Sequence, residues 1–178
     1  MNSDGKNRKL NVREIALFAM LGALMYASKA LMAMLPNIHL IALFIVTFTL
    51  VFRVKALYPI YLYVLLEGVF NGFTAWWIPY LYVWTVLWGA VMLLPKKMPK
   101  KIAVFVYALI AGLHGILFGT LFAPAQAIFF GLNFKGMIAW IAAGLPFDLI
   151  HGISNFCFGF LVLPLTALLK KINAKTMQ

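Results

Sequence analysis

Three polar residues near the end of the chain, Asp148, His151 and Asn155, lie inside an apolar stretch at spacings of three and four residues. In a helix these spacings place the three side chains on one face. Asp148 and His151 could perform acid–base chemistry, with Ser154 as a nucleophile, or they could hold neighbouring helices together through hydrogen bonds. Because no nucleophile elbow or metalloprotease motif accompanies them, we do not expect an enzyme.

Two further ionisable residues, Lys29 and Glu67, also lie within apolar stretches. A charged side chain at the centre of a bilayer costs at least about 2.5 kcal/mol, so each one needs a partner or a purpose. We expect both residues in the outer half of the protein, with Asn71 one helical turn beyond Glu67. They could form an ion pair, or Glu67 could bind a donor group of a substrate.

Aromatic residues offer a second possible binding surface. Tyr80, Trp84 and Trp88 recur every four residues, which places their rings on one face of a helix. Such a face suits a flat heterocyclic ligand, because ring pairs contribute about 0.5 to 1.5 kcal/mol beyond the area they bury. Trp76 and Trp77 stand at the start of the same helix, where they are also typical of an aromatic belt at the membrane surface.

Polar residues near the predicted outer surface complete the candidate site. Gln126 lies at the outer end of an apolar stretch, Asn133 and Lys135 follow in the next loop, and Asn37 and His39 lie in an earlier loop. Lys135 could recognise a carboxylate or phosphate of a ligand, or it could reach lipid headgroups.

No cofactor or metal is expected in this chain. The phosphate-binding motif G-x-x-x-x-G-K-S/T is absent, so ATP-driven work would need a partner protein. Cys157 is the only cysteine, and the three histidines form no i, i+4 pair. An internal disulfide is therefore impossible, and a metal site is not expected.

The elements that must position these residues are membrane-spanning helices. Of 178 residues, 65% are hydrophobic and 11% are charged, which is too few charged residues to cover a soluble globule. We predict a single all-α membrane domain with six transmembrane helices, the short second one thinly spanning or central, and bends at Pro124, Pro146 and Pro164. The predicted helices are 13–35, 39–54, 56–75, 77–95, 101–130 and 137–170.

The basic residues predict the orientation of this bundle. All fifteen except Lys29 and Lys135 fall in the two tails and in two connections between helices. Lys and Arg accumulate in cytoplasmic loops, so we expect both termini in the cytoplasm. The net charge of +11 suits anionic lipids rather than nucleic acid, because no aromatic and basic RNA-binding motif is present. The basic groups are Lys6, Arg8, Lys9 and Arg13; Arg53 and Lys55; Lys96, Lys97, Lys100 and Lys101; and Lys170, Lys171 and Lys175.

Small residues form a stripe on the first predicted helix. Ala19, Ala23 and Ala27 recur at four-residue spacing, which lets another helix approach closely. The stripe could pack inside the bundle or could dock a separate protein.

These features together resemble the substrate-binding S components of energy-coupling factor (ECF) transporters. The resemblance covers the whole chain and rests on the basic N-terminus, the A-x-x-x-A stripe, the six predicted helices and the run P-F-D-x-x-H-x-x-x-N from Pro146 to Asn155. It implies a subunit in a prokaryotic plasma membrane that captures a water-soluble vitamin or vitamin precursor from outside. The resemblance leaves the identity of the vitamin open.

The resemblance also implies partners. A transmembrane coupling subunit would contact Ala19, Ala23 and Ala27, and two cytoplasmic ATPases would supply the energy for uptake. The binding site would lie in the outer half, between the fourth, fifth and sixth helices. A stand-alone secondary transporter is the alternative, although no inverted repeat is detectable.

Overall fold

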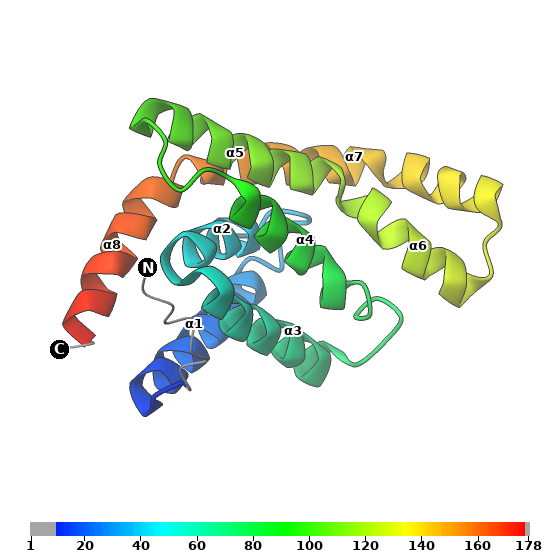
Figure 1. Ribbon diagram of the computed structural model, residues 1–178. Helices are drawn as coiled ribbons and strands as arrows, with labels where there is room; N and C mark the ends of the chain where they lie inside the picture. Colours follow the sequence, from blue (N-terminus) through cyan, green and yellow to red (C-terminus); the bar gives the residue numbers. More distant parts are fainter. Residues whose placement is uncertain (1–9, 177–178) are drawn as a thin grey trace, which may run out of the picture.

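The structure, a computed structural model, describes residues 10–176, and this range folds into helices without β-strands. Figure 1 shows their arrangement. The helices are α1 (Val12–Leu31), α2 (Ile41–Phe52), the 3₁₀ helix η1 (Arg53–Ala56), α3 (Leu57–Asn71), α4 (Tyr80–Leu93), α5 (Lys100–Ile116), α6 (Phe118–Phe130), α7 (Phe134–Gly159) and α8 (Val162–Thr176). Lys6, Arg8 and Lys9 of the predicted basic tail lie outside the described residues.

The helical class predicted from the sequence is confirmed, and the predicted segments coincide with helices. The first four correspond to α1, α2, α3 and α4, the fifth covers α5 and α6 except Lys100, and the sixth covers most of α7 and part of α8. Helix α4, with 14 residues, is apolar but falls short of the length that would cross a membrane. By length and composition, four helical stretches are able to cross a membrane: Val12–Leu31, Ile41–Asn71, Lys100–Phe130 and Phe134–Gly159.

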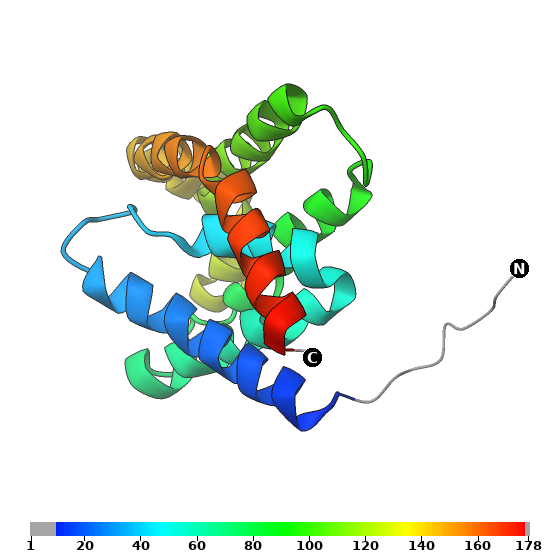
Figure 2. The ribbon, with the colours of Figure 1, turned by 90° about the vertical axis from the view of Figure 1, so that its left-hand side faces the viewer.

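Helix α2 is the centre of the bundle. Every residue from Ile41 to Thr49 is buried, and α2 packs against α4, α5, α7 and α8. In Figure 1, α5 and α7 lie side by side above α2, while α1 and α3 lie side by side below it. Figure 2 shows α8 leaving the direction of α7 and crossing in front of α2. The central position predicted for the second segment is confirmed.

Basic side chains from separate parts of the chain gather at one end of the bundle. Lys55 Nζ lies 2.5 Å from Glu14 Oε1, and Arg53 Nη2 donates to the Met92 carbonyl at 3.2 Å. These contacts bring together the start of α1, the turn at η1 and the end of α4. We call this the basic end, and a cavity there is lined by Arg53 together with Lys96, Lys97, Lys100 and Lys170.

The two longest predicted helices are interrupted, but not where two of the prolines stand. Helix α6 continues through Pro124 and α7 through Pro146, so neither of these prolines, where we predicted bends, ends its helix. Apolar helices tolerate proline where neighbouring groups satisfy the freed backbone. The chain turns instead at Leu117 and at Phe160–Leu161, the latter just before Pro164 in the first turn of α8.

Glycines allow α5 and α7 to pack with their backbones close together. A Cβ atom added to Gly115 would lie 2.8 Å from both Cα and N of Gly152, and one added to Gly152 would lie 3.0 Å from the Gly112 carbonyl oxygen. Real Cβ atoms essentially never come as close as 2.8 Å. Only glycine at these positions permits this approach, which is a common way for helices to associate in lipid.

Candidate functional site

A polar cavity of about 670 Å³ lies at the end of the bundle opposite the basic end. Its walls are the end of α1, the loop 32–40, the end of α3, the loop 72–79 and the start of α4, with one residue each from α6 and α7. This volume is within the range of small-molecule sites in proteins. Six of its polar lining residues are Lys29, His39, Glu67, Asn71, Tyr80 and His151.

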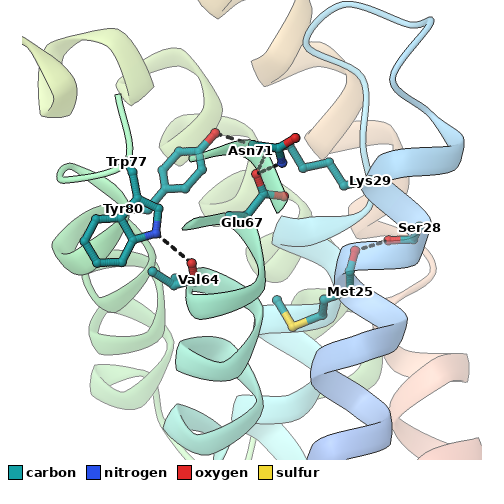
Figure 3. A network of polar contacts seen from close by, with 8 residues as sticks. All are labelled: Met25, Ser28, Lys29, Val64, Glu67, Asn71, Trp77 and Tyr80. Atoms are coloured by element: carbon teal, nitrogen blue, oxygen red, sulfur yellow. Dashed lines mark hydrogen bonds and ion pairs between the residues drawn. The ribbon is translucent and has the colours of Figure 1, made fainter. Parts of the chain in front are cut away.

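Lys29 and Glu67, which both line this cavity, form an ion pair, the first of the two possibilities left by the sequence (Figure 3). Lys29 Nζ donates to Glu67 Oε2 at 2.7 Å and to the Tyr80 hydroxyl at 3.3 Å, and Asn71 Nδ2 donates to the same Glu67 oxygen at 3.1 Å. The Glu67 side chain is 5% exposed, whereas that of Lys29 is 27% exposed. An ammonium group has three donors, and these contacts use two, so Lys29 retains one for a ligand in the cavity.

A hydrogen bond holds the loop 72–79 against α3. Trp77 Nε1 donates to the Val64 carbonyl at 2.7 Å, and Gly72 turns the chain with a φ of 91°. A Cβ on Gly68 would lie 2.8 Å from Trp77 Nε1, so the missing side chain makes room for the indole. Trp77 therefore lines the cavity from a fixed position.

Two imidazoles meet at the polar cavity. The rings of His39 and His151 lie 4.7 Å apart at an interplanar angle of 68°, and both residues line the cavity. His39 Nδ1 and His151 Nε2 are buried without a hydrogen-bond partner among the described residues. His39 lies in the loop 32–40, and burial lowers its pKa to about 4, so it is neutral at neutral pH. A ligand that hydrogen-bonds to these nitrogens would remove the free-energy cost of burying them without a hydrogen-bond partner.

The predicted aromatic face of α4 is divided among different roles. Tyr80 lines the cavity, but Trp84 is only 1% exposed and packs in the core against Tyr80 and Phe118, with centroids 5.6 and 5.3 Å away. Trp88 points to the basic end, where its Nε1 donates to the Arg53 carbonyl at 3.1 Å. Each four-residue step moves a residue about 6 Å along the helix, which removes Trp88 from the cavity.

Phe118 is a lining residue that the sequence did not reveal. It follows the turn at Leu117, and its ring lies 4.8 Å from that of His151. Phenylalanines are frequent in this chain, so composition and spacing gave no signal that distinguished this one. Only the packing of α6 against α7 brings Phe118 to the cavity.

Three further residues predicted to contact a ligand also lie outside the lining of the cavity. Gln126 is fully buried, and its Nε2 donates to the Ala75 carbonyl at 3.4 Å, which ties α6 to the loop 72–79. Asn133 caps α7 by accepting from the Gly136 amide at 2.8 Å. Lys135 is exposed in the first turn of α7. The first two have structural contacts instead, and Lys135 is exposed and not part of the lining.

Asp148, His151 and Asn155 are buried on one face of α7, as predicted, but only His151 reaches the cavity. Both Asp148 carboxylate oxygens accept from the Gly119 amide at 3.1 Å. This amide belongs to the first turn of α6, where a carboxylate complements the unpaired donors and the helix dipole. Asn155 is buried with no hydrogen-bond partner in the described range. Asp148 therefore stabilises the turn between α5 and α6.

Ser154 is not positioned as a nucleophile in this structure. Its hydroxyl donates to the carbonyls of Asn37, at 3.3 Å, and His151, at 2.9 Å. A serine activated by a histidine would instead donate to the imidazole ring. The contact with Asn37 joins α7 to the loop 32–40, which forms part of the cavity wall.

Replacing Asp148 by alanine is expected to lower the free energy of unfolding by about 1 to 2 kcal/mol, the usual cost of removing a helix cap. Asp148→Asn keeps an acceptor oxygen and should lose less than half of that amount. Unfolding of the purified protein, followed by circular dichroism in a denaturant titration, measures both. Equal losses in the two variants would show that the Gly119 contact is not what Asp148 contributes.

The alanine stripe of α1 faces away from the bundle. Ala19, Ala23 and Ala27 are exposed, whereas the buried face of α1 consists of Phe18, Leu21, Gly22 and Met25. The sequence left two interpretations of the stripe. The first, that the stripe packs inside the bundle, is wrong, because the opposite face of α1 contacts α3. The stripe leaves a surface that a second helix could approach closely.

No group of three or more His, Cys, Asp or Glu side chains in the described part of the chain could hold a metal ion. Comparison with protein-family models, curated proteins and solved structures finds no match to this chain. Its function therefore has to be argued from the cavity, the charge distribution and the surface of α1.

Proposed function

We propose that this chain is the substrate-binding subunit of an ECF-type transporter that captures a water-soluble vitamin or vitamin precursor. The observation that carries the proposal is the polar cavity of about 670 Å³ at the end opposite the basic residues. If the basic end faces the cytoplasm, the cavity opens to the outside, where a capture subunit needs its site. The loops 32–40 and 72–79 would cover the bound ligand.

In this proposal the chain crosses the plasma membrane of a prokaryotic cell six times, with both termini in the cytoplasm. Helices α1, α2, α3 and α4 each supply one span, and the pairs α5–α6 and α7–α8 supply the other two. The exposed apolar side chains of α7, such as Phe147, Ile150 and Ile153, suit contact with lipid. The short helix α2 is compatible with one of these spans because it is surrounded by protein and not by lipid.

The energy for uptake would come from partners. The sequence has no ATP-binding motif, and the exposed stripe of Ala19, Ala23 and Ala27 supports docking to a transmembrane coupling subunit. Two cytoplasmic ATPases would bind that subunit. The chain itself would bind no cofactor and catalyse no reaction.

The experiment is a titration of the purified full chain with a panel of water-soluble vitamins, followed by its own tryptophan fluorescence. Trp77 lines the cavity, so a ligand bound there should change the emission. We expect one compound to give a saturable change at submicromolar concentration. A flat response to every compound, in parallel with a responding S component of known specificity, would contradict the proposal.

The variant His151→Phe tests whether that ligand occupies this cavity. It keeps a flat ring but removes both nitrogens, and we expect an affinity about tenfold lower, since one buried hydrogen bond is worth about 1 kcal/mol or more. Lys135→Gln is the control and should bind as the original chain does, because Lys135 is not part of the lining. An equal loss of affinity in both variants would show that the ligand does not bind in this cavity.

A secondary transporter is the second candidate, and one observation favours it. An ion pair inside a membrane segment, as Lys29 and Glu67 form here, often marks a pathway for protons or ions. Proteoliposomes separate the two functions. The isolated chain should accumulate no ligand under an ion gradient if it is a capture subunit, whereas gradient-driven accumulation would establish the carrier.

A further inference from the structure

A second cavity, of about 440 Å³, lies at the basic end, far from the proposed vitamin site. It is formed by the end of α2, the segment 94–98, the first turns of α5, and α8. Five basic residues line it, and none of its described lining residues is acidic. These are Arg53, Lys96, Lys97, Lys100 and Lys170. We infer that this basic cavity binds the phosphate-bearing head group of an anionic phospholipid.

The charges come from separate elements and converge on one space. Arg53 lies at the turn after α2, and its contact with the Met92 carbonyl at 3.2 Å uses one of its five donors. Lys100 begins α5, whose first amides add partial positive charge at the same place. Lys170 comes from α8. A cluster of this kind, with no acidic lining residue, attracts anions to the cavity.

A buried hydroxyl also lines this cavity without a partner. Thr166 is 6% exposed, and its Oγ1 has no hydrogen bond among the described residues. It lies on α8 between Leu163 and Lys170, and the three residues share one helix face that lines the cavity. An unsatisfied buried hydroxyl is unfavourable, and a phosphate oxygen is a strong acceptor for it.

The apolar surroundings favour a lipid over a free anion. Leu50, Val91 and Leu163 form part of the cavity wall. Leu93 is 88% exposed and Ile102 is 54% exposed, and both are sequence neighbours of lining residues. Acyl chains could cover these side chains while the head group enters the cavity. A phosphate ion would leave this apolar surface uncovered. A phospholipid would place its head group among the basic residues and its acyl chains on the apolar side chains.

The test uses the purified full chain in a neutral detergent, titrated with phosphatidylglycerol and followed by native mass spectrometry, which counts bound lipids. We expect one phosphatidylglycerol to bind before any other, and phosphatidylcholine to bind at least tenfold more weakly. Millimolar inorganic phosphate should not displace the bound lipid. Displacement by phosphate would identify a site for a free anion and overturn the lipid proposal.

Two double variants with the same loss of charge separate a site from general attraction. Lys100→Gln with Lys170→Gln removes two lining residues, while Lys101→Gln with Lys171→Gln removes their sequence neighbours, which do not line the cavity. A lysine that contacts the bound head group contributes about fivefold in affinity, so we expect the first variant, which loses two such contacts, to bind at least tenfold more weakly. The second should change affinity less than threefold. Equal weakening would overturn the proposal.

Thr166→Val tests the hydroxyl with no change in charge. Valine has nearly the same shape as threonine, so folding should be retained, and an unchanged unfolding midpoint would confirm this. We expect phosphatidylglycerol to bind about fivefold more weakly, with little change for phosphatidylcholine. An acidic peptide that occupies the cavity of the original chain, while phosphatidylglycerol does not, would assign the cavity to a protein partner and overturn the proposal.

Discussion

Glu67→Leu should lower the free energy of unfolding by about 3 kcal/mol. The substitution leaves the Lys29 ammonium without its carboxylate partner at 2.7 Å, and it also removes the acceptor of Asn71. Breaking one side of a buried ion pair costs about 3 to 5 kcal/mol, and the 27% exposure of the Lys29 side chain favours the lower limit. Reversible unfolding in mixed micelles with increasing denaturing detergent measures the effect.

The double variant Lys29→Met with Glu67→Leu should regain most of the lost stability. Replacing both partners of a buried pair by apolar residues is often neutral, because neither charge then has to lose water. Lys55→Met is the control, since the pair of Lys55 with Glu14 is more open to solvent and such pairs contribute about 1 kcal/mol or less. A double variant as unstable as the sum of its single variants would mean that the two charges do not stabilise each other.

The same double variant also separates folding from ligand binding. If Lys29 contributes its remaining donor to a ligand, the stable double variant should fold but bind the vitamin poorly. This outcome rests on the proposed function, whereas the stability result does not. A folded double variant with full affinity would show that the pair serves the bundle alone.

The sequence offered the Lys29–Glu67 contact as one of two possibilities, because a lysine and a glutamate at similar depth in apolar helices each need a partner. Depth alone did not exclude the other possibility, that Glu67 binds a donor group of a substrate. The face shared by Asp148, His151 and Asn155 was predictable from helical spacing. What each side chain touches was not, because the partner of Asp148 is a backbone amide of Gly119, which carries no signal in the sequence.

The polar cavity illustrates the same limit. His39 and His151 lie more than a hundred residues apart in the sequence, and only the packing of the loop 32–40 on α7 brings their rings to 4.7 Å. Trp88 shows the opposite outcome. Its regular spacing from Tyr80 and Trp84 suggested that all three rings share one binding face, but α4 runs from the cavity to the basic end, where Trp88 lies. Spacing predicts the face of a helix, whereas depth along the helix decides which site a residue joins.

The helical segments themselves were predictable, because long apolar runs have few alternatives. The interruptions within the last two were harder, since prolines are neither necessary nor sufficient to end a helix. At Leu117 the chain turns while the Gly119 amide bonds to Asp148 outside its own helix. The glycines of α5 and α7 did not stand out in the sequence as a packing surface, because their spacing is less regular than that of the alanine stripe of α1.

Those glycines lead to the second large effect: Gly115→Val should lower the free energy of unfolding by about 3 kcal/mol. A Cβ there would lie 2.8 Å from the Gly152 backbone and 2.9 Å from Asn155 Nδ2. Backbone atoms cannot move aside as a side chain can, so α5 and α7 would have to separate, and overpacking of this kind costs about 1 to 3 kcal/mol or more. The same unfolding titration measures the loss.

Gly144→Val is the matched control, because it makes the same change in a helix where an added Cβ meets nothing within 4 Å. Its unfolding free energy should change by less than about 1 kcal/mol, the range of helix propensities. Equal losses would mean that backbone approach is not what holds α5 to α7. If only Gly115→Val is destabilised, the affinity for the ligand proposed to occupy the polar cavity should fall with it. His151 stands on α7 one residue before Gly152, so a displaced α7 would move its imidazole out of that cavity.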